Sequence, residues 1–162
     1  MTIYVKNKDT LIIDDFTIKC CVGKNGISSR KKEGDYCTPK GLFNLNKLYF
    51  RKDRVGNIKC RIKKKNITKN MAWCDDPKNA KYNQEIKTIT KNHKENFYRK
   101  DNKYDYLISI DYNNKNVPNK GSAIFLHLTE NYDPTAGCIA VKKKDFEIIL
   151  KLIDQKTKIK IS

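Results

Sequence analysis

The sequence has no long apolar run. No stretch reaches the about 18 apolar residues that a membrane-spanning helix needs, so no transmembrane segment is expected. Residues 1–5 predict a strand, and no basic region followed by an apolar region is found there, so no signal peptide is visible. The 162 residues fit one domain, residues 1–162, with a hydrophobic core of its own.

Arginine is scarce, although the chain is strongly basic. The net charge is +17, but lysine outnumbers arginine 30 to 5. The lysines are dispersed, with short runs only at 63–65 and 142–144. Arginine is the better reader of bases and phosphates, so nucleic-acid binding is not expected, and a basic module that binds polyanions is kept only as an alternative. An electrostatic attraction for an anionic substrate is the favoured consequence.

Metal-ligand spacing is also absent. The six cysteines form no Cys-x-x-Cys pair, and the two histidines, His93 and His127, do not combine with them at such a spacing. We therefore expect no metal and no cofactor. The five cysteines other than Cys138 are predicted to be small buried apolar residues. His93 lies in a polar stretch and is expected to be a surface or structural residue.

The segments that are present predict a mainly β protein. Alternating or β-branched runs separated by turn residues predict strands within Thr2–Val5, Thr10–Val22, Leu42–Phe50, Tyr106–Tyr112, Ala123–Leu128, Gly137–Val141 and Thr157–Ile161. Residues 23–41 are rich in turn residues and predict a surface loop. Residues 51–105 are polar and weakly patterned, which indicates long connections laid over a sheet.

One amphipathic helix is predicted near the end of the chain. From Asp145, the apolar residues Phe146, Ile149, Leu150 and Ile153 recur at the spacing of one helix face. An acidic residue in the first turn suits the helix dipole.

The segment FLHLTENYDPTAGCIAV, residues 125–141, holds the candidate chemistry. His127 lies in an apolar strand, and a loop of ten residues leads to Cys138 at the start of the next strand. If the two strands are neighbours, the imidazole can take the thiol proton while the thiolate attacks a carbonyl. Gly137 allows a close backbone approach, so the amides of Gly137 and Cys138 could hold an oxyanion. The alternative is a buried thiol near an unrelated core histidine.

These residues resemble the active-site segment of the L,D-transpeptidases with a YkuD-type catalytic domain. His127 is followed by Thr135-Ala136-Gly137-Cys138-Ile139, which matches the family pattern of a histidine and then Ser/Thr-x-Gly-Cys. The chain is more specifically similar to a single-domain subgroup, through GSAIFLHL at 121–128, KEGD at 32–35, TPKGLF at 38–43, WCDDPKNAKYN at 73–83 and KYDYLISIDYN at 103–113. The resemblance implies a YkuD-like β-sandwich or mixed-sheet fold.

The resemblance also implies a reaction. Cys138 would attack the carbonyl of the third residue of a peptidoglycan stem tetrapeptide and form a thioester as the terminal D-alanine leaves. An amine of a neighbouring stem would then give a 3→3 cross-link, with His127 as the base. Water as acceptor would make an L,D-carboxypeptidase, and a D-amino acid would make an exchange enzyme. A relative that binds stem peptides without turnover is a further alternative.

Two departures from the common pattern leave the acyl acceptor open. Ala136 stands where many relatives have a second histidine, and Ala140 stands where they usually have arginine or asparagine. Three residues are candidates for substrate binding, each with a structural alternative: Thr135 could support its loop, Trp73 could be a packing residue, and Asp75 could cap a turn.

The expected partners are peptidoglycan stem peptides. The substrate places the protein in the periplasm or cell envelope, while the lack of a visible signal peptide keeps a cytoplasmic location open. A monomer is expected.

Overall fold

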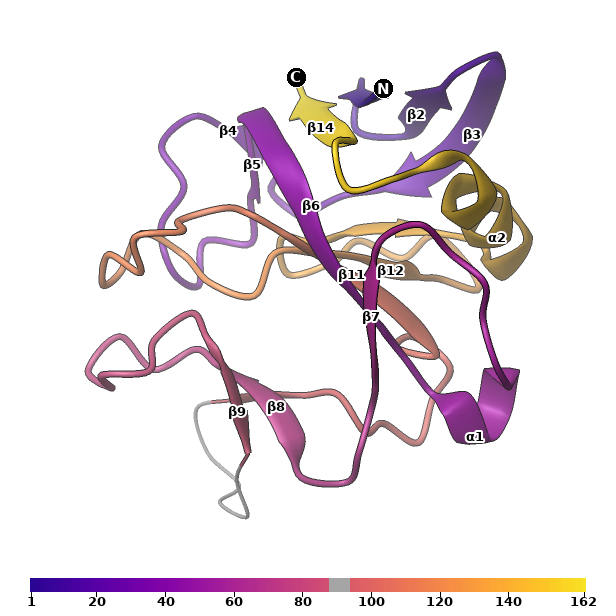
Figure 1. Ribbon diagram of the computed structural model, residues 1–162. Coiled ribbons are helices and arrows are strands. Elements are labelled where there is room, and N and C mark those ends of the chain that lie inside the picture. Colours follow the sequence, from indigo (N-terminus) through magenta and orange to yellow (C-terminus); the bar gives the residue numbers. More distant parts are fainter. Residues whose placement is uncertain (88–93) are drawn as a thin grey trace.

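The computed structural model describes residues 1–87 and 94–162. These residues form a mainly β protein (Figure 1), as the sequence predicts. His93, predicted to be a surface or structural residue, lies outside the described residues.

Eight strands of the described chain close into one mixed barrel. Their order is β11, β12, β13, β3, β2, β1, β14 and β6, and β6 closes the circle by pairing with β11. The strands are β1 (Thr2–Lys6), β2 (Thr10–Ile13), β3 (Phe16–Cys21), β6 (Gly41–Phe50), β11 (Tyr106–Ile110), β12 (Phe125–Leu128), β13 (Ile139–Val141) and β14 (Lys158–Ile161). Each of them coincides with a segment for which the sequence predicts a strand, except that β1 continues to Lys6 and β6 begins at Gly41, one residue beyond the prediction in each case.

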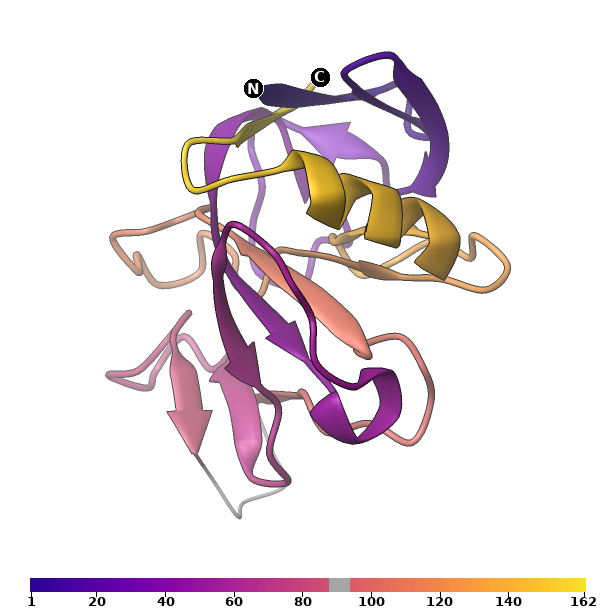
Figure 2. The same cartoon turned by 45° about the vertical axis from the view of Figure 1, so that its right-hand side comes forward.

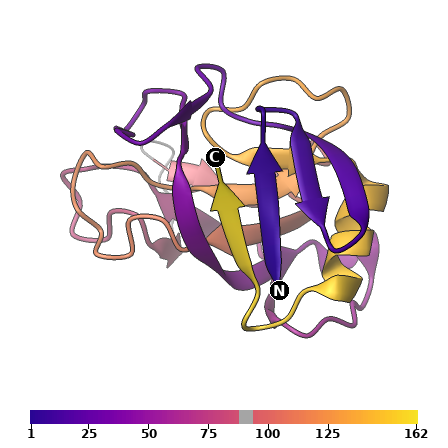
Figure 3. The same ribbon diagram turned by 90° about the horizontal axis from the view of Figure 1, so that it is seen from above.

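The length of β6 makes the closure possible. Its first half pairs with β14 and its second half with β11, both antiparallel. Leu45 and Leu48 are buried in the interior. A further strand, β7 (Lys63–Asn66), runs parallel to β6 along its end. Figure 3 shows β14 beside β1, and because the two strands are parallel, the N-terminus and the C-terminus lie at opposite ends of this strand pair.

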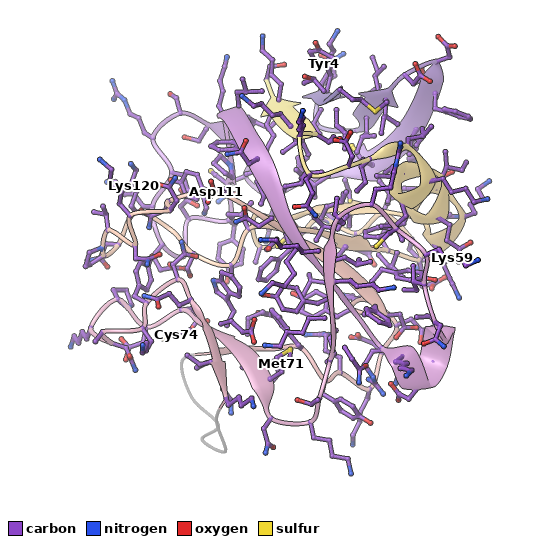
Figure 4. The ribbon with its side chains drawn as sticks, in the orientation of Figure 1. Tyr4, Lys59, Met71, Cys74, Asp111 and Lys120 are labelled. Carbon is purple, nitrogen blue, oxygen red and sulfur yellow. The ribbon has the colours of Figure 1, made fainter. Side chains whose placement is uncertain are left out.

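A second, three-stranded sheet lies apart from the barrel. It consists of β8 (Met71–Cys74), β9 (Glu85–Lys87) and β10 (Lys94–Asn96), and Figure 4 labels both ends of β8. Two short strands, β4 (Ile27–Ser28) and β5 (Thr38–Pro39), pair within the predicted loop. Residues 51–105 were expected to form only connections. That expectation is wrong, because this part of the chain contains β7, β8, β9 and β10. β9 (EIK) and β10 (KEN) consist largely of charged or polar residues, so no alternation of apolar residues marks them in the sequence.

The predicted helix is present as α2 (Lys143–Leu152), and it lies beside the barrel (Figure 2). Phe146, Ile149 and Leu150 are its buried residues. It begins two residues before Asp145, the predicted start. A second helix, α1 (Lys52–Val55), was not predicted, because four residues cannot show a helical period.

The apolar residues form two cores. The larger core fills the barrel and includes the buried face of α2. The smaller core joins the outer side of β11 and β12 to β8, and it contains Met71, Phe97, Leu107, Phe125 and Cys138. The candidate nucleophile therefore belongs to the packing between the barrel and the small sheet.

Candidate active site

A cavity of about 760 Å³ contains both candidate catalytic residues. His127 and Cys138 line it together with Tyr104, Ala123 and Thr135. The six cysteines are free thiols, and Cys138 is buried. The predicted burial of the other five holds for three of them, while Cys37 and Cys60 are half-buried.

The strand register places the two side chains on the same face. β12 and β13 are parallel neighbours, and His127 is paired with Ala140. Cys138 lies two residues before Ala140, so it projects to the same side as His127. In an ideal parallel pair, a strand spacing of about 4.8 Å and a rise of about 6.6 Å over two residues would separate the two Cα atoms by about 8 Å. The loop of residues 129–137 thus brings the predicted pair into one cavity, and its catalytic role remains a prediction.

His127 is oriented by a backbone carbonyl. Its Nδ1 lies 2.9 Å from the oxygen of Leu128. A carbonyl only accepts, so Nδ1 carries the proton and Nε2 keeps its lone pair. Burial lowers the pKa of His127 to about 4, so the imidazole is neutral at pH 7. The ring of Tyr104 packs edge-on against it at 5.2 Å between centroids. A neutral imidazole with a fixed tautomer is suited to act as a base.

Cys138 is held as a neutral thiol. Its Sγ donates to the carbonyl oxygen of Ala123 at 3.2 Å. Burial raises the pKa of Cys138 to about 12, although a backbone hydrogen bond from Phe125 acts in the opposite direction. The resting site therefore holds a thiol and an imidazole rather than an ion pair. Any attack by Sγ requires that its proton be removed during the reaction.

Gly137 occupies a position that only glycine suits. Its φ is +139°, and a Cβ would lie 2.8 Å from the carbonyl oxygen of Cys37. Its N–H donates to Oγ1 of Thr135 at 3.1 Å. The amide of Gly137 is therefore engaged within its own loop. The oxyanion role of Gly137 and Cys138 stays a prediction.

Thr135 stabilises the loop of residues 129–137 through hydrogen bonds. Its Oγ1 donates to the carbonyl oxygen of Cys138 at 2.6 Å. Its backbone N–H donates to Val22, and its carbonyl accepts from Lys24. Loop support is thus present, and the hydroxyl also borders the cavity, where a substrate contact remains a prediction.

The other two predicted substrate residues are placed differently. Asp75 lines the cavity beside Glu95. Trp73 is not among the lining residues. Its ring stacks on Phe97 at 6.2 Å and meets Phe125 edge-on at 5.4 Å. Its Nε1 donates to Asn83. These contacts agree with the alternative that Trp73 is a packing residue.

The cavity wall also contains residues that the sequence reasoning missed. Tyr104 donates to Oε1 of Glu95 at 2.8 Å, and Arg99 lies 3.4 Å from the same oxygen. Burial raises the pKa of Glu95. Tyr104 falls within the family-like stretch 103–113, but Glu95 and Arg99 carry no sequence signal. The wall has both charge signs, so the excess of lysine is not concentrated in it.

No group of three or more His, Cys, Asp or Glu side chains within 1–87 and 94–162 could hold a metal ion. No helix in that part of the chain is long and apolar enough to cross a membrane.

The family model of the YkuD L,D-transpeptidase catalytic domain matches residues 1–161. No curated protein and no solved structure matches the chain. The family match spans all the residues that line the cavity.

Proposed function

Because the chain belongs to the YkuD family of L,D-transpeptidase catalytic domains, we propose that it performs cysteine acyl transfer on peptidoglycan stem peptides and forms 3→3 cross-links. The family itself implies a transpeptidase-type activity on peptidoglycan. The observation that carries the proposal is the placement of His127 and Cys138 on one face of β12 and β13, in one cavity.

The first half-reaction begins with proton transfer from Cys138. Nε2 of His127 takes the proton as Sγ leaves its bond to Ala123 and attacks the carbonyl of the third stem residue. The tetrahedral oxyanion forms beside the amide of Cys138, and the imidazolium gives its proton to the departing D-alanine amine. A thioester on Cys138 remains. Because the thiol and the imidazole are both neutral at rest, formation of their ion pair is unfavourable until the substrate supplies an electrophile.

The second half-reaction selects the product. An amine of a neighbouring stem attacks the thioester, His127 takes its proton, and Sγ leaves. Water in the same position would give a tripeptide, and a D-amino acid would give an exchanged stem. Ala136 and Ala140 place no side-chain donor next to the nucleophile. The choice among acceptors therefore depends on the rest of the cavity wall.

A second function is favoured by one observation. The buried Cys138 thiol has a raised pKa, as expected of a relative that binds stem peptides without turnover. Such a relative would keep the cavity and use the thiol only for packing.

Mass spectrometry separates these functions. Wild type and Cys138→Ala are incubated with a disaccharide-tetrapeptide, and intact protein and products are weighed. A thioester adduct and a cross-linked dimer, both absent in the variant, support the transpeptidase. Tripeptide alone, with the same dependence, supports the carboxypeptidase. Binding of the muropeptide without adduct or product supports the non-catalytic function and overturns the proposal.

Three further features belong to this proposal. Stem peptides of the cell wall are the partner, so the cell envelope is the proposed location. Residues 1–162 are proposed to act as one catalytic domain, which the family match over 1–161 supports. Action as a monomer is the remaining feature, which an assay at graded protein concentration tests.

A further inference from the structure

We propose that Asn83 is a positioning residue that aligns the Cys138 thiol by holding Ala123. This inference rests on the acyl-transfer function proposed above. It concerns a side chain that lies outside the lining of the catalytic cavity.

The side-chain amide of Asn83 uses its complete hydrogen-bonding capacity. Nδ2 donates to the carbonyl oxygens of Tyr112 at 3.1 Å and Asn113 at 3.0 Å. Oδ1 accepts from Nε1 of Trp73 at 2.9 Å and from the backbone N–H of Ala123 at 3.2 Å. Asn83 is buried, and an amide offers two donors and two acceptor sites. The side chain therefore fixes three segments relative to one another.

Ala123 is the segment that matters for the chemistry. Its φ is +54°, a left-handed conformation that alanine adopts only when its surroundings impose it. The N–H of Ala123 donates to Oδ1 of Asn83. The carbonyl oxygen of Ala123 accepts the hydrogen of the Cys138 thiol. The bonds thus run from Asn83 through one strained residue to the nucleophile. Loss of the Asn83 contact removes the restraint that keeps this carbonyl aimed at Sγ.

The Cys138 thiol is hydrogen-bonded to the start of the segment that carries His127, its proposed base. Ala123 precedes β12, and His127 lies within β12. Besides Ala123, the thiol has a hydrogen bond from the Phe125 backbone. Without the Ala123 contact, the resting thiol loses the hydrogen bond that fixes the direction of Sγ before its proton is transferred. A misplacement of about 1 Å can reduce a rate by about 100-fold, so a modest change in Ala123 has a measurable effect.

The charged and titratable groups around Cys138 come from other elements. Glu95 and Lys31 act on the thiol through their charges, Cys21 contributes a further thiol, and Tyr104 and His127 share the cavity. None of the five is hydrogen-bonded to Asn83. Replacement of Asn83 by a neutral residue therefore leaves these groups in place.

Asn113 provides a matched control. It is also a buried asparagine with positive φ, and each of the two residues is 8% exposed. Its side chain bonds to Val117 and Gly121 and holds its own loop. Its side chain makes no bond to Ala123, and its backbone carbonyl, which accepts from Nδ2 of Asn83, is kept when Asn113 is replaced by alanine. Both Asn83→Ala and Asn113→Ala remove a buried amide, but only the first releases Ala123.

The test compares kinetics on a disaccharide-tetrapeptide with alkylation of Cys138 by iodoacetamide. For Asn83→Ala we expect kcat to fall between about 10- and 100-fold, with KM within about twofold of wild type. The pH midpoint of Cys138 alkylation should fall, because the neutral thiol loses its acceptor. Asn113→Ala should leave both kcat and the pH midpoint of alkylation unchanged, and it should lower only the thermal stability.

A double variant adds a rescue. Glycine adopts positive φ without strain, so Ala123→Gly in the Asn83→Ala background should restore part of kcat. Equal effects of Asn83→Ala and Asn113→Ala, or an unchanged midpoint together with an unchanged kcat, would overturn the inference. If wild type shows no turnover, the pH midpoints of Cys138 alkylation still test the role of Asn83. Failure of this inference is therefore distinguishable from failure of the proposed function.

Discussion

Gly137 lies against the carbonyl of Cys37 so closely that a Cβ on it would be 2.8 Å from that oxygen. The neighbouring atom is backbone, so it cannot turn aside as a flexible side chain would. Gly137 also has a φ of +139°, which side chains disfavour. The residue before Cys138 is therefore constrained twice, by its conformation and by the loop that it touches.

Gly137→Ala should reduce activity by more than about 100-fold and destabilise the fold by about 1–3 kcal/mol. The clash must move either the loop of residues 129–137 or the segment that contains Cys37. Gly56→Ala is the control, because Gly56 has positive φ but no neighbour within 4 Å of the added Cβ. It should keep full activity and lose about 1 kcal/mol. Thermal unfolding and kcat/KM measure both, and an active Gly137→Ala would show that the close contact is unimportant.

His127 should make stability fall on acidification. Burial lowers its pKa to about 4 in the fold, against about 6.5 in the unfolded chain. Above pH 6.5 the residue is neutral in both states and its contribution is complete. Between pH 6.5 and 4 only the unfolded state binds the proton, so up to about 3 kcal/mol is lost as pH falls through this range.

The measurement is the free energy of unfolding of wild type and His127→Gln at several pH values. The difference between the two proteins isolates His127 from the carboxylates that titrate nearby. We expect it to change between pH 6.5 and 4 and to be constant above. A constant difference over the whole range would contradict the buried neutral imidazole.

Cys138 should react slowly with iodoacetamide at neutral pH. Burial raises its pKa to about 12, and only the thiolate is a nucleophile. The alkylation rate should therefore rise about tenfold for each pH unit through pH 10. Peptide mass spectrometry identifies the modified cysteine, and Cys37 and Cys60, which are half-buried, serve as references in the same sample. A plateau below pH 8 would indicate a thiolate at rest.

The barrel strands and the placement of His127 near Cys138 could be predicted because their signals are local. Tyr106–Ile110 and Phe125–Leu128 are apolar runs of strand length, and His127 and Cys138 lie eleven positions apart. The closure of β6 onto β11 could not be predicted, since strand pairing depends on packing between distant residues. The contacts of Glu95 with Tyr104, and of Asn83 with Ala123, likewise arise only from tertiary structure.

Thr135 should be replaceable by serine but not by valine. Its hydroxyl donates to the carbonyl of Cys138 and accepts from the N–H of Gly137. Valine has nearly the same shape but leaves both backbone groups without this partner, at a cost of about 1–3 kcal/mol. Thr135→Val should lose stability and kcat, while Thr135→Ser should retain most of both. Equal behaviour of the two variants in thermal unfolding and turnover would assign the role of Thr135 to its shape alone.

Trp73 should affect stability more than substrate affinity. Its ring packs on Phe97 and Phe125, and its Nε1 bonds to Asn83 rather than reaching the cavity. Trp73→Phe removes ring volume and this one donor, so we expect a loss of about 1–3 kcal/mol. KM for the tetrapeptide should stay within about twofold, and kcat should fall less than in Asn83→Ala, because the Ala123 contact remains. Tyr82→Phe is a comparison outside the aromatic cluster, since it removes only a hydroxyl that bonds to Glu33 and Gly121. A rise in KM confined to Trp73→Phe would restore the substrate-wall role that the sequence left open, because packing alone gives no reason for weaker binding.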